Sequence, residues 1–261
     1  MNAERIPIKT RAEIEAMRET GRHVAEILLE LRALVEPGLT PAELDRHARK
    51  RIAERKLCSS FLNYGPGGLP PYPAVVCVSV NDEIVHGIPG PRELKAGDVV
   101  SIDFGVERGG LHGDSAFTMA VGEVSEEAER LVEVTHESLY RGLEQMVPGQ
   151  RLSDIGAAVQ EHAEGAGFSV VRQFVGHGIG RAMHELPQVP NYGRKGRGPR
   201  LLPGMVFAIE PMVNVGSHRV RMLDDEWTAV TADGALSAHF EHTVLITENG
   251  PEVLTKVAGS H

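Results

Sequence analysis

The stretch Phe174-Val-Gly-His-Gly-Ile-Gly-Arg-Ala-Met-His184 decides how the rest of this chain is interpreted, because it places three glycines around one histidine, His177. A second histidine, His184, follows within the same short segment. Glycine lets the backbone turn sharply and approach a ligand closely. We therefore expect a turn that presents His177 rather than packing it. The alternative is a glycine-rich loop whose two histidines are incidental.

The composition is that of an ordinary globular protein, because 41% of the 261 residues are hydrophobic and 24% are charged. The formal net charge of −9 argues against nonspecific binding to nucleic acid or to anionic membranes. The two cysteines, Cys58 and Cys77, are not spaced for a zinc cage, and so few cysteines are typical of a reducing compartment. No signal-peptide pattern or membrane-length apolar run is present. We expect a cytoplasmic protein with neither DNA nor a membrane as partner.

Capping residues and apolar spacing predict where helices begin and end. Helices are predicted after four N-cap residues, namely Thr10, Thr40, Ser125 and Ser153. Strands are predicted over 74–80, 99–106, 112–121, 168–175, 205–213 and 238–247. Proline and glycine make 63–73 a long irregular loop, and loops of this kind often carry function. The basic segment 193–200 is predicted to be a solvated surface loop, with an electrostatic contact to an acidic or RNA partner as the alternative.

The chain contains a short internal repeat. Residues 37–44 align without gaps on 148–155, and 97–103 align on 204–210 at nearly the same separation. Each half then runs helix, helix, strands, which predicts two similar halves around a pseudo-twofold axis. We expect one mixed α/β (α+β) domain over 1–261, with an N-terminal arm at 1–9 and a loose tail at 256–261. Its helices should cover one face of a curved antiparallel sheet.

Four acids lie in or beside apolar strands. Side chains alternate along a strand, so Asp103 points away from the apolar face of its strand. Asp114 lies on the returning arm of the same hairpin, while Glu210 and Glu241 interrupt two later apolar strands. Carboxylates in such strands are costly unless something compensates their charge. Buried salt bridges are one explanation, but few lysines or arginines flank these strands.

Metal ions supply the compensating charge better. Four carboxylates and the imidazole of His177 would suit two divalent cations, with some carboxylates bridging. Oxygen-rich ligation with one nitrogen favours Mn, Fe(II), Co or Zn over a thiolate site. Two such ions, about 3.5–4 Å apart, activate a water and polarise a carbonyl. The residues therefore predict a dinuclear metallohydrolase.

The chain resembles type I methionine aminopeptidases over essentially its full length. The motifs that carry the resemblance are Val85-His-Gly-Ile-Pro, Ile102-Asp-Phe, His112-Gly-Asp-Ser, the block 176–189, Phe207-Ala-Ile-Glu-Pro and Phe240-Glu-His-Thr. The resemblance implies a pita-bread α/β fold with internal pseudo-symmetry, which agrees with the repeat. It also implies a monomer that removes the N-terminal methionine from nascent proteins when the next residue is small.

The resemblance further implies a set of metal ligands. Asp103 would hold one metal ion, and Asp114 and Glu241 would bridge both ions. His177 and Glu210 would complete the second site. The metal-activated water would then attack the first peptide bond.

Roles in catalysis and substrate binding follow from the same resemblance. Glu210 would carry the proton of the nucleophilic water, and His86 would lie near the substrate amine and the scissile amide. His184 would hydrogen-bond the substrate carbonyl and stabilise the tetrahedral intermediate. The methionine thioether would occupy an apolar pocket lined by Cys77, Tyr72, Met183 and Trp227.

The sequence differs from the resembled family in one loop, and three alternative functions remain to be weighed. The loop 65–71 is longer and more proline-rich than is usual in the resembled family. No N-terminal ribosome-docking extension is expected, so any transient ribosome contact would use the basic loop 193–200. The rivals are a proline-specific aminopeptidase or dipeptidase, a binding protein that has lost its metals, and a nucleic-acid-binding module. The presence of all the ligand positions argues against the second rival, and the acidic balance argues against the third.

Overall fold

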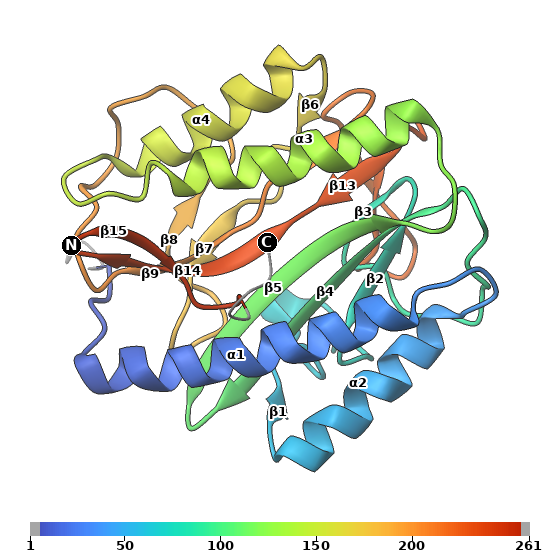
Figure 1. The fold of residues 1–261 in the computed structure, drawn as a ribbon, viewed down its shortest axis with the longest axis horizontal. Coiled ribbons are helices and arrows are strands. Elements are labelled where there is room, and N and C mark those ends of the chain that lie inside the picture. Colours follow the sequence, from blue (N-terminus) through green and yellow to red (C-terminus); the bar gives the residue numbers. More distant parts are fainter. Residues whose placement is uncertain (1–5, 257–261) are drawn as a thin grey trace.

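A computed structural model describes residues 6–256 (Figure 1). Parts of the expected arm and tail, residues 1–5 and 257–261, lie outside the described residues. The helices are α1 (Arg11–Leu34), α2 (Pro41–Arg55), α3 (Glu126–Leu143) and α4 (Leu152–Gly165), and a short 3₁₀ turn, η1, spans Pro66–Gly68. The strands are β1 (Cys58–Ser59), β2 (Cys77–Val80), β3 (Glu83–Val85), β4 (Val99–Arg108), β5 (Leu111–Ala120), β6 (Ser169–Val170), β7 (Gly176–Gly178), β8 (Glu185–Val189), β9 (Val206–Ile209), β10 (Met212–Asn214), β11 (Val220–Met222), β12 (Ala229–Thr231), β13 (Ser237–His239), β14 (Glu241–Thr247) and β15 (Gly250–Val253).

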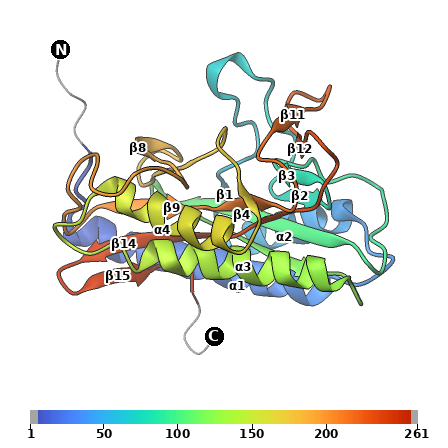
Figure 2. The ribbon, with the colours of Figure 1, turned by 90° about the horizontal axis from the view of Figure 1, so that it is seen from above.

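The largest sheet has nine antiparallel strands in the order β1-β4-β5-β14-β9-β7-β8, with β2 also pairing with β4 and β15 with β14. Two three-stranded sheets, β13-β10-β6 and β11-β12-β3, flank it. Figure 2 shows α1 and α3 lying along one face of the main sheet, while β11 and β12 project from the other face. The prediction that helices cover one face of a curved antiparallel sheet is confirmed.

Two packed cores under the helices reproduce the repeat seen in the sequence. In the first core, Leu31 of α1 and Leu44 of α2 pack with Phe104 of β4. In the second, Leu139 of α3 and Ile155 of α4 pack with residues of β9 and β14. Each half therefore buries a helix pair against its own part of the sheet, as the repeat predicted.

Capping residues set the starts of most helices as predicted. The Thr10 and Thr40 side chains form capping boxes before α1 and α2, and Ser125 accepts a hydrogen bond from the Ala128 backbone before α3. Ser153, however, is not the N-cap of α4, because that helix begins one residue earlier. The Ser153 hydroxyl instead accepts a hydrogen bond, 2.7 Å long, from the backbone N–H of Arg197.

Three predicted strands are broken where the chain changes direction. The predicted strand 205–213 is β9 followed by β10, which belong to different sheets, with Glu210 and Pro211 between them. The predicted strand 238–247 is likewise β13 and β14, separated by Phe240. The predicted strand 168–175 is reduced to β6, and the chain is irregular from there to β7. The break between β9 and β10 contains Glu210, and the break between β13 and β14 directly precedes Glu241. Both are acids of the predicted metal centre.

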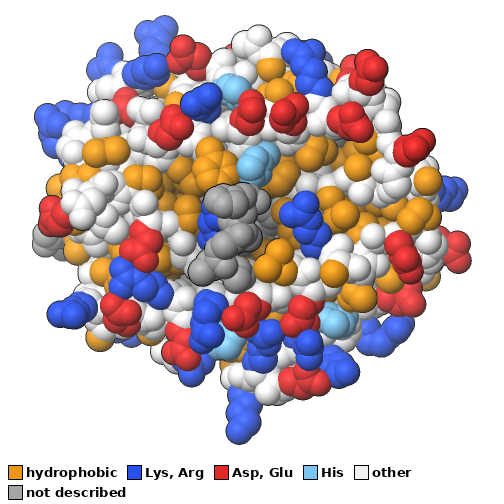
Figure 3. All heavy atoms as spheres, in the orientation of Figure 1, with side chains coloured by type: hydrophobic (Ala, Val, Ile, Leu, Met, Phe, Trp, Pro, Cys, Tyr) orange, Lys and Arg blue, Asp and Glu red, His pale blue; other side chains and the backbone are white. Residues whose placement is uncertain are grey.

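The helix-covered face carries a groove of about 570 Å³ between α1 and α3. Figure 3 shows hydrophobic side chains gathered in a band across this face. Leu28, Val132, Tyr140 and Phe240 are among the residues that line the groove. Figure 2 shows α1 and α3 on the face of the sheet opposite to β11 and β12, so the groove that their residues line lies on that face. Among the described residues, no helix has the length and apolar character needed to cross a membrane.

Candidate metal centre and active site

His177 lies in β7, inside the main sheet, and not in a turn as the glycine-rich sequence predicted. A Cβ atom on Gly176 would stand 2.4 Å from the carbonyl oxygen of Ala208, and one on Gly178 would stand 2.2 Å from that of Leu186. The glycines therefore let β7 fit closely between its neighbours. As a result the side chain of His177, only 6% exposed, is packed rather than presented.

Hydrogen bonding determines which ring nitrogen of His177 is available. Nδ1 lies 2.8 Å from the backbone oxygen of Gly178, which can only accept, so Nδ1 carries the proton and donates it. Nε2 therefore offers its lone pair, 3.5 Å from Oε1 of Glu210. Burial, assisted by the charge of His184, lowers the pKa of His177 to about 3. The ring is thus neutral near pH 7, which is the form that binds a metal.

The strand register brings three acids onto the face of the sheet that the helices leave open. Asp103 of β4 pairs with Ala116 of β5, and Ala116 pairs with Glu241 of β14, so these residues form one row across three strands. Asp114 lies on the same face of β5 as Ala116. The next residue along β4, Phe104, is in the helix-side core. The prediction that Asp103 points away from the apolar face of its strand is therefore confirmed.

Glu210 reaches the same centre from the second half of the chain. It follows the last residue of β9 and precedes Pro211, which has no N–H to continue a ladder. The side-chain amide of Asn191 donates a hydrogen bond to the Glu210 backbone oxygen, 3.0 Å away, and so holds this break in place. The Glu210 side chain is mostly buried and lies beside His177.

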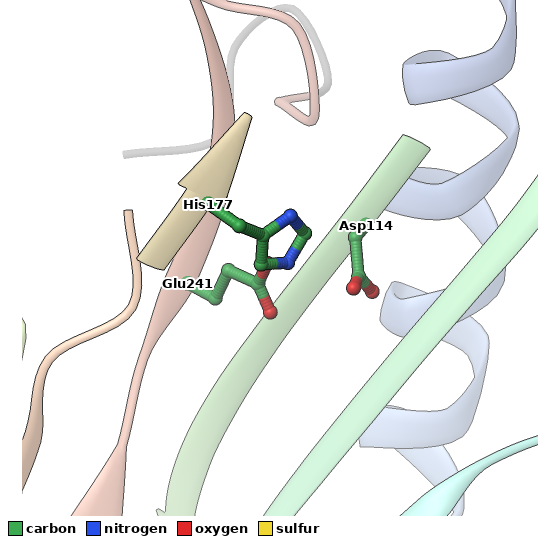
Figure 4. A group of neighbouring side chains, drawn as sticks. All are labelled: Asp114, His177 and Glu241. Atoms are coloured by element: carbon green, nitrogen blue, oxygen red, sulfur yellow. The ribbon is translucent and has the colours of Figure 1, made fainter. Parts of the chain in front are cut away.

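The chemistry of the cluster fits divalent metal ions. Figure 4 shows Asp114, His177 and Glu241 pointing toward one another from β5, β7 and β14, and one ligand atom of each lies within 4.8 Å of the others. Oδ1 of Asp103, Oδ1 of Asp114 and Oε1 of Glu241 are buried without a hydrogen-bond partner. Within residues 6–256, no lysine or arginine forms an ion pair with these carboxylates or with Glu210. Buried oxygens of this kind need a cation.

The pKa values of the four carboxyl groups also indicate that positive charge is missing from the cluster. Burial raises the pKa of Asp114 to about 7. Burial, followed by the charges of neighbouring carboxylates, raises the pKa of Asp103, Glu210 and Glu241 well above the usual range. Without a cation the cluster therefore holds protons near neutral pH. A donor set of carboxylate oxygens and one imidazole nitrogen is suited to Mn, Fe(II), Co or Zn.

Two further histidines stand beside the centre. The His184 ring centroid lies 4.1 Å from that of His177, but the His184 side chain is exposed. His86 has a left-handed φ of 61° and packs edge-on against Phe174 and Trp227, with centroid distances of 5.3 and 5.9 Å. Burial, assisted by the charge of His184, lowers the pKa of His86 to about 4. The protein atoms around the His184 ring desolvate it in part and so lower its pKa, although the residue keeps contact with solvent. Both rings are therefore neutral near pH 7.

The expected pocket residues come together in one place. Tyr72, Cys77, Met183 and Trp227 belong to a single buried cluster. The Tyr72 and Trp227 rings meet edge to face, with centroids 5.2 Å apart. Cys77 of β2 pairs directly across from Asp103 of β4, so the apolar cluster borders the carboxylates.

Sequence reasoning missed two residues near the site. The Tyr64 hydroxyl lies 2.6 Å from Nδ1 of His184, although Tyr64 comes from an irregular loop in which no periodic pattern marks any side chain. His239 is buried, and its Nε2 has no hydrogen-bond partner among the described residues. A polar residue in an apolar strand, close to Glu241, was the available signal for His239.

The buried carboxylates have no cationic partner among the described residues, and a neutral imidazole lies beside them. This combination is typical of the metal centre of a metalloenzyme. Residues 15–248 match metallopeptidase family M24. The methionine aminopeptidase of Clostridium perfringens is 53% identical over 252 residues, which cover 97% of this chain and 99% of that protein. This chain belongs to metallopeptidase family M24, and within it to the methionine aminopeptidases, as its motifs predicted.

Solved structures agree with this assignment. A methionine aminopeptidase from Thermotoga maritima has a TM-score of 0.92 and 46% identity, and the match covers 97% of this chain and all 100% of that one. A prolidase from Pyrococcus furiosus has a TM-score of 0.75 and 22% identity, covering 96% of this chain and 65% of the prolidase chain. At this low identity, the similarity to the prolidase shows only that the two proteins share a fold. The predicted pita-bread fold is confirmed, and the chain is a hydrolase.

Proposed function

We propose that this protein removes the N-terminal methionine from nascent proteins and peptides when the next residue is small, using two divalent metal ions. The observation that carries the proposal is the juxtaposition of the buried carboxylates and His177 with the apolar cluster around Cys77. Bound divalent ions lower the pKa of water and polarise a carbonyl, which is the chemistry that peptide hydrolysis needs.

The order of the strands supports a division of the proposed ligands between two ions. Asp103 would hold one ion, and His177 and Glu210, which lie next to each other, would hold the other. Asp114 and Glu241 lie between these two sides and would bridge both ions. The buried, unpartnered oxygens of Asp103, Asp114 and Glu241 support this arrangement.

The residues around the ions would divide the remaining work. Glu210, which lies beside His177, would accept the proton of the attacking water and pass it on. His184 would donate a hydrogen bond to the substrate carbonyl as negative charge develops there. His86, held between two aromatic rings, would contact the N-terminal amine and the scissile amide.

The apolar cluster accounts for selectivity at the first residue. An unbranched thioether side chain would contact Tyr72, Met183 and Trp227 favourably, because sulfur makes favourable contacts with aromatic rings. The Tyr72 hydroxyl donates to the Gly87 backbone oxygen, 2.9 Å away, which fixes one wall of this cluster.

The direct test is hydrolysis of Met-Ala-Ser by the metal-free protein, followed by addition of Co, Mn, Fe(II) or Zn one at a time. We expect no turnover without metal, recovery with at least one metal, and a binding stoichiometry of two ions per chain. A peptide with tryptophan after methionine serves as the matched control and should be cleaved far more slowly. Preference for Xaa-Pro peptides, or full activity in the metal-free protein, would contradict the proposal.

The cellular setting is also part of the proposal. We infer a cytoplasmic monomer that meets its substrates on the ribosome through the basic loop 193–200. Every residue of that loop is exposed, and Arg197 and Gly196 donate backbone hydrogen bonds to Ser153 and Asp154 of α4. These hydrogen bonds hold the backbone of the loop against α4, while its basic side chains remain exposed.

Co-sedimentation with ribosomes at increasing salt tests this contact. Neutralising Arg194, Lys195 and Arg197 together should weaken binding and make it less dependent on salt. Neutralising the exposed Arg46, Lys50 and Lys56, in and just after α2, removes the same charge elsewhere and should have little effect. Unchanged affinity after neutralising the loop would exclude it as the contact surface. Sedimentation of the free protein should give the mass of one chain.

A further inference from the structure

The proline- and glycine-rich loop 63–73 supplies a contact to His184. Tyr64, at the start of this loop, places its hydroxyl 2.6 Å from Nδ1 of His184. The two rings also stack, with centroids 5.2 Å apart and planes inclined by 22°. A hydrogen bond and a ring stack from the same side chain restrict both the position and the rotation of the imidazole.

The loop is itself fixed to the apolar cluster. Asn63 donates a backbone hydrogen bond to Tyr72, and Tyr72 donates one to Tyr64, with N···O distances of 2.9 and 2.8 Å. The indole N–H of Trp227 donates to the backbone oxygen of Pro70, 2.9 Å away. Both ends of the loop are thus hydrogen-bonded to Tyr72 or Trp227 of the cluster. These bonds restrict the position of the Tyr64 backbone.

The backbone that carries His184 is held by a different set of contacts. The Glu185 carboxylate accepts hydrogen bonds from the backbone N–H groups of Arg181 and Ala182, at 2.7 and 3.3 Å. The ammonium group of Lys9, which is buried, pairs with the same carboxylate. Removing the Tyr64 hydroxyl should therefore change the imidazole ring without changing the path of the chain.

The hydrogen bond from Tyr64 bears on which ring nitrogen of His184 carries the proton. A neutral imidazole has one N–H and one bare nitrogen, and a neighbour decides between the two tautomers. An imidazole nitrogen is a much stronger base than a phenolic oxygen, so the favoured sense is from the Tyr64 O–H to the bare nitrogen. The other nitrogen, Nε2, has no hydrogen-bond partner among the described residues.

We propose that Tyr64 is a positioning residue for the aminopeptidase reaction: its hydroxyl donates to Nδ1 of His184 and so keeps the ring proton on Nε2. Nε2–H is then the group that can donate to the substrate carbonyl oxygen. With the opposite tautomer, Nε2 would repel that oxygen. This inference rests on the donor role of His184 given above.

The tautomer can be measured directly by nitrogen NMR of ¹⁵N-histidine-labelled, zinc-loaded protein. In the wild-type protein, we expect His184 to show an unprotonated Nδ1 and a protonated Nε2. In Tyr64→Phe, which keeps the ring stack, we expect a mixture of the two tautomers. The distant Tyr140→Phe variant, in which a groove residue on the opposite face loses its hydroxyl, should leave the His184 signals unchanged.

Kinetics on Met-Ala-Ser then tests the consequence. Loss of one hydrogen bond that orients a donor should lower kcat of Tyr64→Phe about 5- to 10-fold, with KM within about twofold and metal content unchanged. In a His184→Ala background the same change should have no further effect, because Tyr64 acts through His184. Tyr140→Phe should match the wild type.

Three results would overturn the proposal: a protonated Nδ1 of His184 in the wild-type protein, an unchanged tautomer in Tyr64→Phe, or an equal loss of kcat with and without His184. These results are separable from a failure of the proposed function. If no metal restored hydrolysis of Met-Ala-Ser, the aminopeptidase assignment would fail, whereas the NMR comparison would still decide whether Tyr64 sets the tautomer.

Discussion

His177 and His184 come from one short segment, yet they differ in exposure and in the partner of Nδ1. His177 lies within a strand, buried, with Nδ1 bonded to a backbone oxygen that never changes its protonation. His184 lies beyond the strand, exposed, with Nδ1 bonded to a hydroxyl from another loop. Their rings nevertheless lie 4.1 Å apart.

The difference shows how one segment can serve two parts of a site. A metal ligand benefits from a rigid, desolvated lone pair, which the backbone bond of His177 provides. A group that meets the substrate benefits from access and from a proton that points outward, which His184 obtains from its exposed position. The comparison predicts that changes at the two histidines separate metal binding from turnover.

The largest effect is expected for His177→Ala. The variant loses the imidazole that lies within the buried cluster of Asp114, Glu210 and Glu241, so it should lose metal and fall below detectable activity on Met-Ala-Ser. Metal content by elemental analysis and turnover are the two measurements. His162→Ala should keep both, because the ring of His162 in α4 contacts Glu137 of α3 instead. Wild-type metal content in His177→Ala would break the distinction between the two histidines.

Asp103→Asn tests the carboxylate side of the same centre. The amide keeps the shape of the side chain but removes the negative charge that the cluster shares, so metal affinity and activity should both collapse. Asp98→Asn, in which the acid caps a turn rather than facing the centre, is the matched control for charge. Full activity in Asp103→Asn would overturn the metal assignment altogether.

A smaller loss is expected for His184→Ala, and it should be of a different kind. The metals should stay bound, because His184 is exposed and is not part of the buried cluster of Asp114, His177 and Glu241. We expect kcat to fall by about 10²-fold, the scale of losing one donor to a developing oxyanion. Retained metal with unchanged kcat would refute the donor role of His184, whereas loss of metal would erase the contrast with His177.

Features governed by local chemistry could be read from the sequence. The capping boxes at Thr10 and Thr40 involve residues three positions apart, so α1 and α2 were predictable from neighbours alone. Asp103 was placed on the correct face because strand alternation is also local. The repeat predicted two similar halves because each half has its own core.

Features governed by distant contacts could not be read in the same way. The apolar run around Glu210 is continuous, so nothing in its periodicity shows that β9 and β10 pair in different sheets, and Pro211 was the single local warning. Ser153 resembles an N-cap but its hydroxyl is taken by Arg197, which is far along the chain. His177 was predicted to be presented because its glycines suggest a turn, whereas they accommodate neighbouring backbone.

The smallest expected effect concerns protons in the metal-free protein. Burial raises the pKa of Asp114 from 3.8 to about 7 in the folded state, while the unfolded chain keeps the ordinary value. Between these two pH values the folded state binds more protons than the unfolded state. The contribution of Asp114 to the free energy of unfolding should therefore fall as pH rises from about 4 to about 7, by up to about 1.4 kcal/mol per pH unit. His86 and His177, whose folded-state pKa values are lowered, contribute in the opposite direction. Stability from this source is fully present below pH 4 and is lost as pH passes the folded-state pKa.

Urea unfolding of chelator-treated protein at pH 5 and pH 7 measures this dependence, and it returns to the contrast between the two histidines. Added metal should remove the loss at pH 7, because the cation replaces the protons on the carboxylates. Asp114→Asn should remove this contribution, since an amide does not titrate in this range, so the unaltered protein should lose stability relative to Asp114→Asn as pH rises from 5 to 7. Comparing the two proteins cancels the opposite contribution of the histidines. The same difference should persist in a His184→Ala background. If the two profiles coincided, the Asp114 carboxylate would already be compensated within the fold, and the argument for metal from its burial would fail.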